Sequence, residues 1–165
     1  MKTIKLYHAT NYKNISEFKI IKKKKRFCEL GEGVYFTSNL EQAKRFGKKY
    51  IYEIEIDIDL FKCYEHIQNE DFVYLCYLCR IGLENIAKET IDKFDGYDIV
   101  ISPVLAKAKK FANKSEMFNE GDIDYNEIKK YFKLHEGMNQ YCLKTKKVLN
   151  YINKKGFLKY KIQDR

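Results

Sequence analysis

The segment GEGVYFTSNLEQA (residues 31–43) joins two glycines to a short aromatic run and then to a helical pattern. The run Val34–Thr37 favours a strand, because β-branched and aromatic residues fill it. Ser38, with Glu41 three residues later, matches a capping box and predicts that a helix starts there. The glycines before the strand allow two explanations: a tight turn, or a backbone that holds the ring of Tyr35 against a flat ligand.

Strand and helix patterns alternate on both sides of this segment. The clearest strand is YIYEIEIDID (residues 50–59), in which apolar residues alternate with Glu53, Glu55 and Asp57. The expected strands are 3–8, 34–37, 50–59, 97–103, 139–145 and 157–162, with a loop over 22–33. The expected helices are 38–46, 71–82, 83–94, parts of 104–118 and 124–134, and 146–152. These patterns predict an α+β fold that forms one domain over residues 1–165.

The composition excludes several classes of protein. The chain of 165 residues contains 14 Tyr and 11 Phe but a single Pro, which argues against disorder. Neither a signal peptide nor a membrane span is expected, because the start of the chain has no apolar run and nowhere do about 18 apolar residues follow one another. The five cysteines are irregularly spaced. They suit reduced thiols in a cytoplasm better than a disulfide framework, so a cytoplasmic protein is predicted.

The net charge of +9 is unevenly distributed along the chain. Residues 1–27 carry nine Lys and Arg against one acidic residue, and residues 107–165 carry fifteen against seven. Between them, residues 28–106 carry eight basic against fifteen acidic residues. Two basic ends around an acidic middle are either a solvated surface or a surface that attracts a polyanion or an acidic partner protein, and charge alone leaves both explanations open.

Several residues that could carry chemistry also have structural explanations. Cys76 and Cys79 form a C-x-x-C inside an apolar helix without a second pair at zinc-ligand spacing, which favours buried side chains over metal ligands, so no metal site is predicted. His66 and His135 have no evident partners in the sequence and are expected on the surface. Asp98 fits a turn as well as an acid at a strand end. The glycine-rich nucleotide motifs and G-x-S-x-G are absent.

Three further residues stand at notable points of the expected elements. His8 ends the first strand, Tyr35 follows the glycines, and Gln140 opens a late strand. Taken one at a time, each has an ordinary structural explanation: a strand-end histidine with its bonds satisfied, a packed tyrosine and a surface glutamine. Their order along the chain and their places on these elements make a more specific pattern.

The segments LYHAT, GEGVYFTSNLEQA and NQYCLK resemble the signature segments of the ADP-ribosyltransferase fold. The resemblance is to the His-Tyr-Glu branch, which includes the poly(ADP-ribose) polymerases and diphtheria toxin. The pattern from LYHAT through YDIVISPV to MNQYCLKTKKVL is similar to a bacterial family of uncharacterised transferase-like proteins that also carry Gln at the third position. This similarity covers nearly the whole chain.

The resemblance implies a split β-sheet core with helical insertions, in which NAD binds as co-substrate between two small sheets. His8 would bond the adenine-side ribose, and the backbone of Ala9 would pair with the nicotinamide carboxamide. Tyr35 and a second aromatic residue, for which Phe46 is the nearest match, would enclose the cationic nicotinamide ring. The implied NAD-binding residues are His8, Ala9, Thr10, Gly33, Tyr35 and Phe46, and the implied catalytic residues are His8, Tyr35 and Gln140.

Gln140 stands where the polymerase-like relatives have Glu. An amide can still bond a ribose hydroxyl, but it offers neither a negative charge nor a proton acceptor for acid–base chemistry. This departure disfavours polymer elongation and is compatible with transfer of one ADP-ribose to a protein or nucleic-acid acceptor, or with NAD hydrolysis. The leading hypothesis is an NAD-dependent mono-ADP-ribosyltransferase, a bacterial toxin or effector with an antitoxin partner by analogy with the wider fold. The alternatives are a catalytically weak NAD- or ADP-ribose-binding module and a basic nucleic-acid-binding protein.

Overall fold

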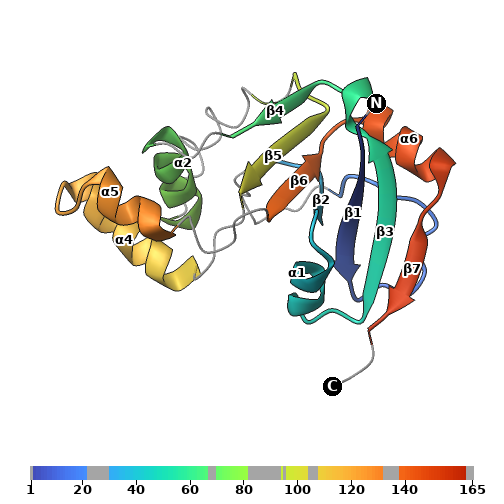
Figure 1. Cartoon of the computed structure of the whole chain (residues 1–165), viewed down its shortest axis with the longest axis horizontal. Coiled ribbons are helices and arrows are strands. Elements are labelled where there is room, and N and C mark those ends of the chain that lie inside the picture. The colour runs from blue at the N-terminus through green and yellow to red at the C-terminus, as the bar shows by residue number, and fades with distance from the viewer. Residues whose placement is uncertain are drawn as a thin grey trace.

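A computed structural model of the protein describes residues 2–21, 30–66, 70–81, 94, 96–103, 108–131 and 138–162. Within these ranges the chain forms one mixed sheet of seven strands, in the order β4-β5-β6-β2-β1-β3-β7 (Figure 1). The strands are β1 Thr3–Thr10, β2 Val34–Thr37, β3 Tyr50–Asp57, β4 Cys63–Glu65, β5 Ile99–Pro103, β6 Asn139–Leu143 and β7 Leu158–Lys161. The helices are α1 Leu40–Arg45, α2 Glu70–Ile81, α4 Ala108–Glu120, α5 Tyr125–Ile128 and α6 Lys146–Lys155, with 3₁₀ turns at Ile58–Leu60 and Lys129–Tyr131. The predicted α+β class is confirmed.

Most elements lie where the sequence predicts them, with ends that differ by a few residues. The exception is β4, where no strand or helix is predicted. It is three residues long, so it is too short to show a period, and it forms because Cys63 to Glu65 pair in parallel with β5. The predicted strand over 50–59 ends at Asp57, where a 3₁₀ turn begins. The predicted helix over 83–94 lies outside the described residues except for Phe94, and so does most of the predicted loop over 22–33.

The predicted capping box at Ser38 and Glu41 is wrong by one residue. The N-cap of α1 is Asn39, whose side-chain oxygen accepts a hydrogen bond from the backbone N–H of Gln42 at 2.9 Å. Ser38 instead bonds to β6, because its backbone N–H donates to the Asn139 carbonyl at 3.2 Å. Asn and Ser are equally good N-caps, so pairing with the sheet decides which of the two residues starts the helix.

The larger hydrophobic core lies on one face of the sheet, which we call the core face. There α6 and the segment 15–20 cover alternate residues of the strands. Helix α6 begins at the N-cap Thr145 and buries Val148, Leu149 and Ile152, which are spaced at helical intervals. On the sheet side the core includes Leu6, Phe36, Ile54, Ile56, Ile99, Tyr141 and Leu143.

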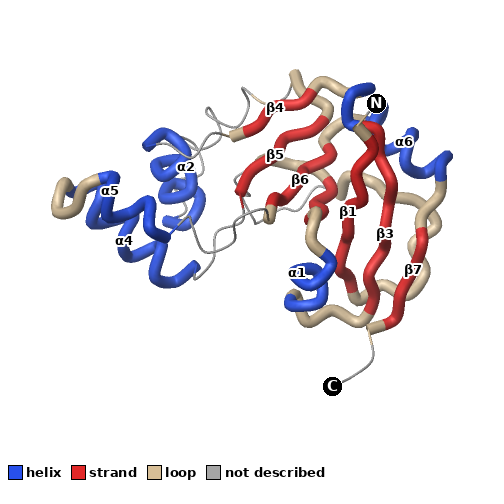
Figure 2. Tube along the Cα trace, in the orientation of Figure 1, coloured by secondary structure: helices blue, strands red, loops and turns tan. Residues whose placement is uncertain are grey.

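The opposite face carries a smaller core beside β4, β5 and β6. Its buried residues are Leu30, Leu75, Phe94, Val100 and Cys142. Leu75 belongs to α2, so this helix reaches the sheet, whereas α4 and α5 lie farther out beyond the β4 edge (Figure 2). An ion pair between Lys114 and Glu127, with Nζ and Oε1 at 3.4 Å, joins the segments of α4 and α5.

Strand β1 pairs very differently with its two neighbours. Its ladder with β3 joins eight residue pairs, from Thr3 with Asp57 to Thr10 with Tyr50. Among the described residues, its ladder with β2 consists of the single pair Tyr7 and Thr37. Beyond this pair, residues 8–10 of β1 and 34–36 of β2 run past each other without a ladder. We call this stretch the seam.

Candidate functional site

His8 lies at the seam and is bonded across it. Its Nδ1 is 2.7 Å from the backbone oxygen of Tyr35. A carbonyl oxygen only accepts, so Nδ1 carries the proton and the neutral ring has its acceptor lone pair on Nε2. The ring also packs against Phe18 and Phe36, at centroid distances of 5.5 and 5.4 Å. The side chain therefore has both a packing role and a fixed tautomer.

Tyr35 is held on the opposite face from His8. Its hydroxyl donates to the backbone oxygen of Gly31 at 2.7 Å, and its half-buried ring packs against the smaller core. Gly31 has φ of 77°, a conformation that glycine adopts without strain. This glycine therefore makes the turn before β2 and also anchors the tyrosine ring.

Gly33 is required for a different reason. A Cβ at this position would lie 2.7 Å from the Leu143 backbone oxygen and would also collide with Cys142 Sγ. Unlike Gly31, Gly33 does not have a positive φ. Gly33 thus permits close approach of β2 to β6. The first of the two glycines makes the turn, and the second allows strand pairing.

Gln140 belongs to a row of polar side chains that crosses the sheet. It pairs with Thr37 of β2 on one side and with Ser102 of β5 on the other. Its Nε2 donates to Ser102 Oγ at 3.0 Å. Directly paired residues point to the same face of a sheet, so the row continues to Tyr7 and Glu53. We call Ser102, Gln140, Thr37, Tyr7 and Glu53 the polar row.

The three predicted catalytic residues come from adjacent strands, but they do not form one cluster on one face. Strand alternation places Tyr35 and Gln140 on the face of the polar row, and His8 on the core face beside Phe36. All three lie beside the seam. His8 bonds the Tyr35 carbonyl across it. Thr37, which pairs with Gln140, also pairs with Tyr7 of β1.

The remaining predicted NAD-binding residues lie near the same end of the sheet. Ala9 and Thr10 are the last residues of β1 and pair with Ile51 and Tyr50 of β3. Thr10 is buried, and its Oγ1 accepts a hydrogen bond from the Tyr12 backbone N–H at 3.2 Å. Phe46 caps the C-terminal end of α1 and is 56% exposed, so it is a large apolar side chain in contact with solvent.

Sequence reasoning missed the polar residues that surround Gln140. Ser102 is fully buried, and Thr37 and Gln42 are nearly so. The hydroxyl of Thr37 donates to Gln42 Oε1 at 2.7 Å, which joins β2 to α1. Ser102 could have been noticed as a polar residue within the apolar stretch 99–103, whereas Thr37 and Gln42 stand beside other polar residues and give no such signal.

Glu53 is a buried carboxylate in the polar row. Its side chain bonds Lys5 Nζ at 2.8 Å and Tyr160 OH at 2.9 Å. The hydrogen bond from Lys5 lowers the pKa of Glu53, against the opposing effect of burial, and the Tyr160 hydroxyl adds to this lowering. The Glu53 carboxylate is thus bonded to residues of the neighbouring strands β1 and β7.

His66 is buried, so the prediction of a surface histidine is wrong. It is 8% exposed, and Nε2 has no hydrogen-bond partner among the described residues. Burial lowers the pKa of His66 to about 4. The rings of Tyr64, Phe72 and Phe94 surround it, with centroids 4.8 to 5.1 Å away. The unpredicted strand β4 is the reason, because it carries His66 to the sheet face. His135 lies outside the described residues.

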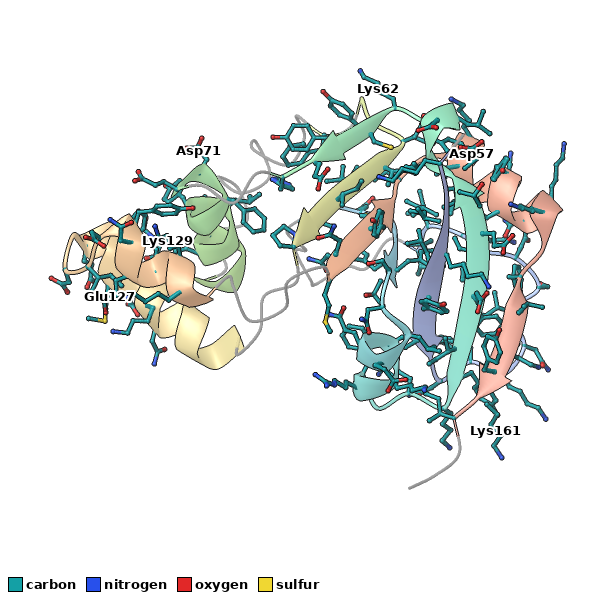
Figure 3. The ribbon with its side chains drawn as sticks, in the orientation of Figure 1. Asp57, Lys62, Asp71, Glu127, Lys129 and Lys161 are labelled. Atoms are coloured by element: carbon teal, nitrogen blue, oxygen red, sulfur yellow. The ribbon has the colours of Figure 1, made fainter. Side chains whose placement is uncertain are left out.

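Asp98 is a structural turn residue. It accepts hydrogen bonds from Thr145 Oγ1 at 2.6 Å and from the Lys62 backbone N–H at 3.1 Å. Burial would raise the pKa of Asp98, but these bonds and Lys147 outweigh it and hold the pKa below its usual value. Lys62 lies at the end of the sheet where β4 begins, and Lys161 marks the opposite end (Figure 3). Asp98 ties this first end to the start of α6.

The basic C-terminal part of the chain is partly engaged within the fold. Lys147 lies 3.4 Å from an Asp98 carboxylate oxygen, and Lys155 lies 3.8 Å from one of Glu55. An open groove beside α6 contains none of the predicted site residues, and it is lined by Ser16, Glu17, Asn150, Asn153 and Lys154.

The part of the chain that the structure describes contains no group of three or more His, Cys, Asp or Glu residues that could hold a metal ion. The thiols of Cys63 and Cys142 are not joined in a disulfide. The side chains of Cys76 and Cys79 lie outside the described part, although their backbones belong to α2. None of the described helices combines the length and the apolar character needed to cross a membrane.

Comparison with known proteins identifies one family. No curated protein and no solved structure shows significant similarity to the chain. A family model described as protein of unknown function (DUF3990) matches residues 4–153, which include every residue of the seam and of the polar row. The protein is therefore a member of the DUF3990 family.

Proposed function

We propose that the protein is an NAD-dependent mono-ADP-ribosyltransferase. One observation carries the proposal. Strands β1 and β2 are neighbours inside the sheet, but they form no backbone ladder where His8 and Tyr35 meet, and Gln140 lies on the next strand, β6. A ligand that lies along the seam would meet groups from both halves of the sheet. The sequence resemblance to the ADP-ribosyltransferases of the His-Tyr-Glu branch involves the same three residues.

The tautomer of His8 suits binding of a sugar. With its proton on Nδ1 and donated to the Tyr35 carbonyl, the neutral ring carries its acceptor lone pair on Nε2. A ribose hydroxyl is a donor that such a nitrogen can bind. The bond to the backbone also orients the ring before the ligand arrives, which lowers the entropy cost of binding.

Tyr35 supplies an aromatic surface that is fixed in place. The bond from its hydroxyl to Gly31 holds one end of the ring, and the smaller core supports it. The nicotinamide ring of NAD is cationic and is attracted to an aromatic face by about 0.5 to 2 kcal/mol. Release of nicotinamide removes this charge, so the contact also favours product departure.

The reaction breaks the bond between C1′ of the ribose and the nicotinamide nitrogen. The bonding electron pair leaves with nicotinamide, which becomes neutral, and positive charge develops on the sugar ring. The acceptor then gives an electron pair to C1′ and loses a proton to the solvent or to a neighbouring base. Gln140 would bond a ribose hydroxyl and hold the sugar in place during these changes, without the charge of a carboxylate.

A second candidate function, a binding module for NAD or ADP-ribose, is favoured by the position of Glu53. This carboxylate shares the polar row with Gln140 but lies three strands away, which is about 14 Å at the usual strand spacing. It is also bonded by Lys5 and Tyr160. Glu53 therefore cannot replace the charge that Gln140 lacks.

Release of nicotinamide from NAD, measured with and without cell extract as a source of acceptors, tests the proposal. The wild-type protein should release nicotinamide and label an acceptor with ADP-ribose. Gln140→Glu restores a charge near the sugar, so it should preserve or raise NAD hydrolysis. Asn126→Asp, on the exposed surface of α5, adds the same charge far from the seam and should change nothing.

The outcomes separate the two candidates. If neither the wild type nor Gln140→Glu releases nicotinamide while NAD still stabilises the protein against heat, the binding module replaces the enzyme. If NAD neither reacts nor stabilises the protein, both candidates fail, and the basic nucleic-acid-binding protein becomes the leading hypothesis.

A further inference from the structure

The Gln140 amide has two possible orientations, and its neighbours select one of them. On the β5 side, Ser102 is fully buried, so its hydroxyl proton needs an acceptor within the protein. That acceptor is the Pro103 carbonyl, 3.3 Å from Ser102 Oγ. A hydroxyl has one proton, so with Oε1 toward Ser102 only one of the two contacts could be a hydrogen bond. With Nε2 toward Ser102 both contacts are bonded, because Gln140 donates to Ser102 and Ser102 donates to Pro103, and this favours the orientation with the amide nitrogen inward.

The neighbour on the β2 side follows the same logic. The hydroxyl proton of Thr37 is donated to Gln42 Oε1 at 2.7 Å, in a buried bond. The Asn39 backbone N–H donates to the same Thr37 oxygen at 3.3 Å. Thr37 therefore has no proton to offer Gln140, and neither hydroxyl beside Gln140 donates to its Oε1.

We infer that Ser102 is a positioning residue that fixes the Gln140 amide with Nε2 inward and Oε1 toward the ligand, so that this position selects a neutral hydrogen-bond donor, a sugar hydroxyl, and rejects an anionic group. The identification of the sugar as the ribose of NAD rests on the proposed function. The orientation of the amide does not, because it follows from hydrogen bonds within the protein.

This arrangement explains how a glutamine serves where a carboxylate would be expected. An amide that was free to flip would also present its NH₂ group to the ligand, and in that orientation it could not accept a hydrogen bond from a donor. Fixed by Ser102, it presents an acceptor oxygen as a carboxylate does, but without charge. The preference for a neutral hydrogen-bond donor therefore depends on Gln140 and Ser102 together.

The test compares Ser102→Ala with Ser115→Ala, because Ser115 of α4 is also fully buried but lies away from the polar row. The first measurement is the side-chain NH₂ signal of Gln140 in an NMR spectrum of the ligand-free protein, assigned by its loss in Gln140→Ala. Ser102→Ala should move this signal and speed its proton exchange, because one hydrogen bond is lost. Ser115→Ala should leave it in place. Ser102→Cys, which keeps the side-chain size but accepts weakly, is the second variant if the alanine variant does not fold.

The second measurement is the affinity for NAD. Ser102→Ala should weaken it about three- to tenfold, the effect of one net hydrogen bond, and Ser115→Ala should not. A Gln140 signal that stays unchanged in both Ser102 variants overturns the positioning role, whatever the protein does with NAD. A moved signal with unchanged NAD affinity overturns the ligand assignment. A wild-type protein that does not bind NAD overturns the proposed function, and the NMR result then still decides the positioning role.

Discussion

The two sides of strand β1 show how one sheet can be closed along one boundary and open along the next. Toward β3, eight residue pairs join the strands over their whole length. Toward β2, the described residues contribute one pair, and the seam follows. Both boundaries lie in the interior of the sheet, so the contrast is not the ordinary fraying of an edge strand.

The difference shows that a side chain can replace a ladder bond. Backbone groups in the interior of a protein need partners, and an open ladder leaves some of them without strand partners. At the seam the carbonyl of Tyr35 is bonded by the ring of His8. A residue predicted to bind a ligand therefore also satisfies the backbone at the place where the two halves of the sheet separate.

The close approach of Gly33 to β6 should be sensitive to any side chain at that position. Gly33→Ala places a Cβ against the Leu143 carbonyl and Cys142 Sγ, so β2 and β6 can no longer approach. We expect the free energy of unfolding, measured in urea, to fall by about 3 kcal/mol. Gly96→Ala is the matched control, since its Cβ would meet only the flexible end of Lys62 at 3.7 Å. Equal stability of the two variants would contradict the close approach of β2 and β6.

Tyr35 tests whether the seam binds a ring. Tyr35→Ala removes the aromatic surface and should weaken NAD binding about 30-fold, which corresponds to about 2 kcal/mol. Tyr35→Phe loses only the bond to Gly31 and should keep most of the affinity. Calorimetric titration with NAD measures both variants. A Tyr35→Ala variant that is folded and binds NAD as tightly as the wild type would remove this residue from the site.

His66 tests, through pH, the half of the sheet on the other side of the seam from β3, where it lies beside β4 and β5. Its folded pKa of about 4 lies below the unfolded value of about 6.5, so the unfolded chain binds the proton more tightly. The contribution of His66 to the free energy of unfolding should therefore be fully present above about pH 6.5. It should fall by up to about 1.4 kcal/mol per pH unit as the pH decreases toward 4. Urea unfolding at several pH values measures this slope, and His66→Leu should flatten it. The carboxyls of Glu53 and Asp98, with lowered pKa values, lose their contribution at lower pH and set the remaining slope.

His8 allows the two roles of the ring to be separated. His8→Asn keeps a donor near the position of Nδ1, and with it the bond to the Tyr35 carbonyl, but removes Nε2. His8→Gln places its amide near the position of Nε2 instead. We expect His8→Asn to fold and to bind NAD about tenfold more weakly, the effect of one hydrogen bond to a ligand. His8→Gln loses the bond to the Tyr35 carbonyl, so its free energy of unfolding should fall while its affinity for NAD stays closer to that of the wild type. The reverse order of effects would leave His8 a purely structural residue.

Period and composition were enough to predict most of the elements. The alternation in residues 50–59 identifies β3, and the spacing of Val148, Leu149 and Ile152 is that of the buried side of α6. These signals are local, because each element must bury one face whatever its neighbours are. The same reasoning could not find β4, which is three residues long and exists only through its pairing with β5.

The candidate site was predicted in part. The order of His8, Tyr35 and Gln140 along the chain directed attention to β1, β2 and β6, and the register makes these strands neighbours. The residues that control them were missed. Ser102 is a single serine in an apolar strand, and its bond to Gln140 spans 38 residues of sequence. No local pattern reports a contact at that distance.

By itself, the sequence of this protein determined most of the strands and helices, the α+β class and the presence of two glycines before β2. It did so because hydrophobic period, turn residues and backbone freedom act over a few neighbouring positions. Only the tertiary structure decided that β1 leaves its partner after Tyr7, that His66 is buried, and that Ser102 orients Gln140. Each of these depends on which strands become neighbours and in what register, which is set by the packing of the whole chain.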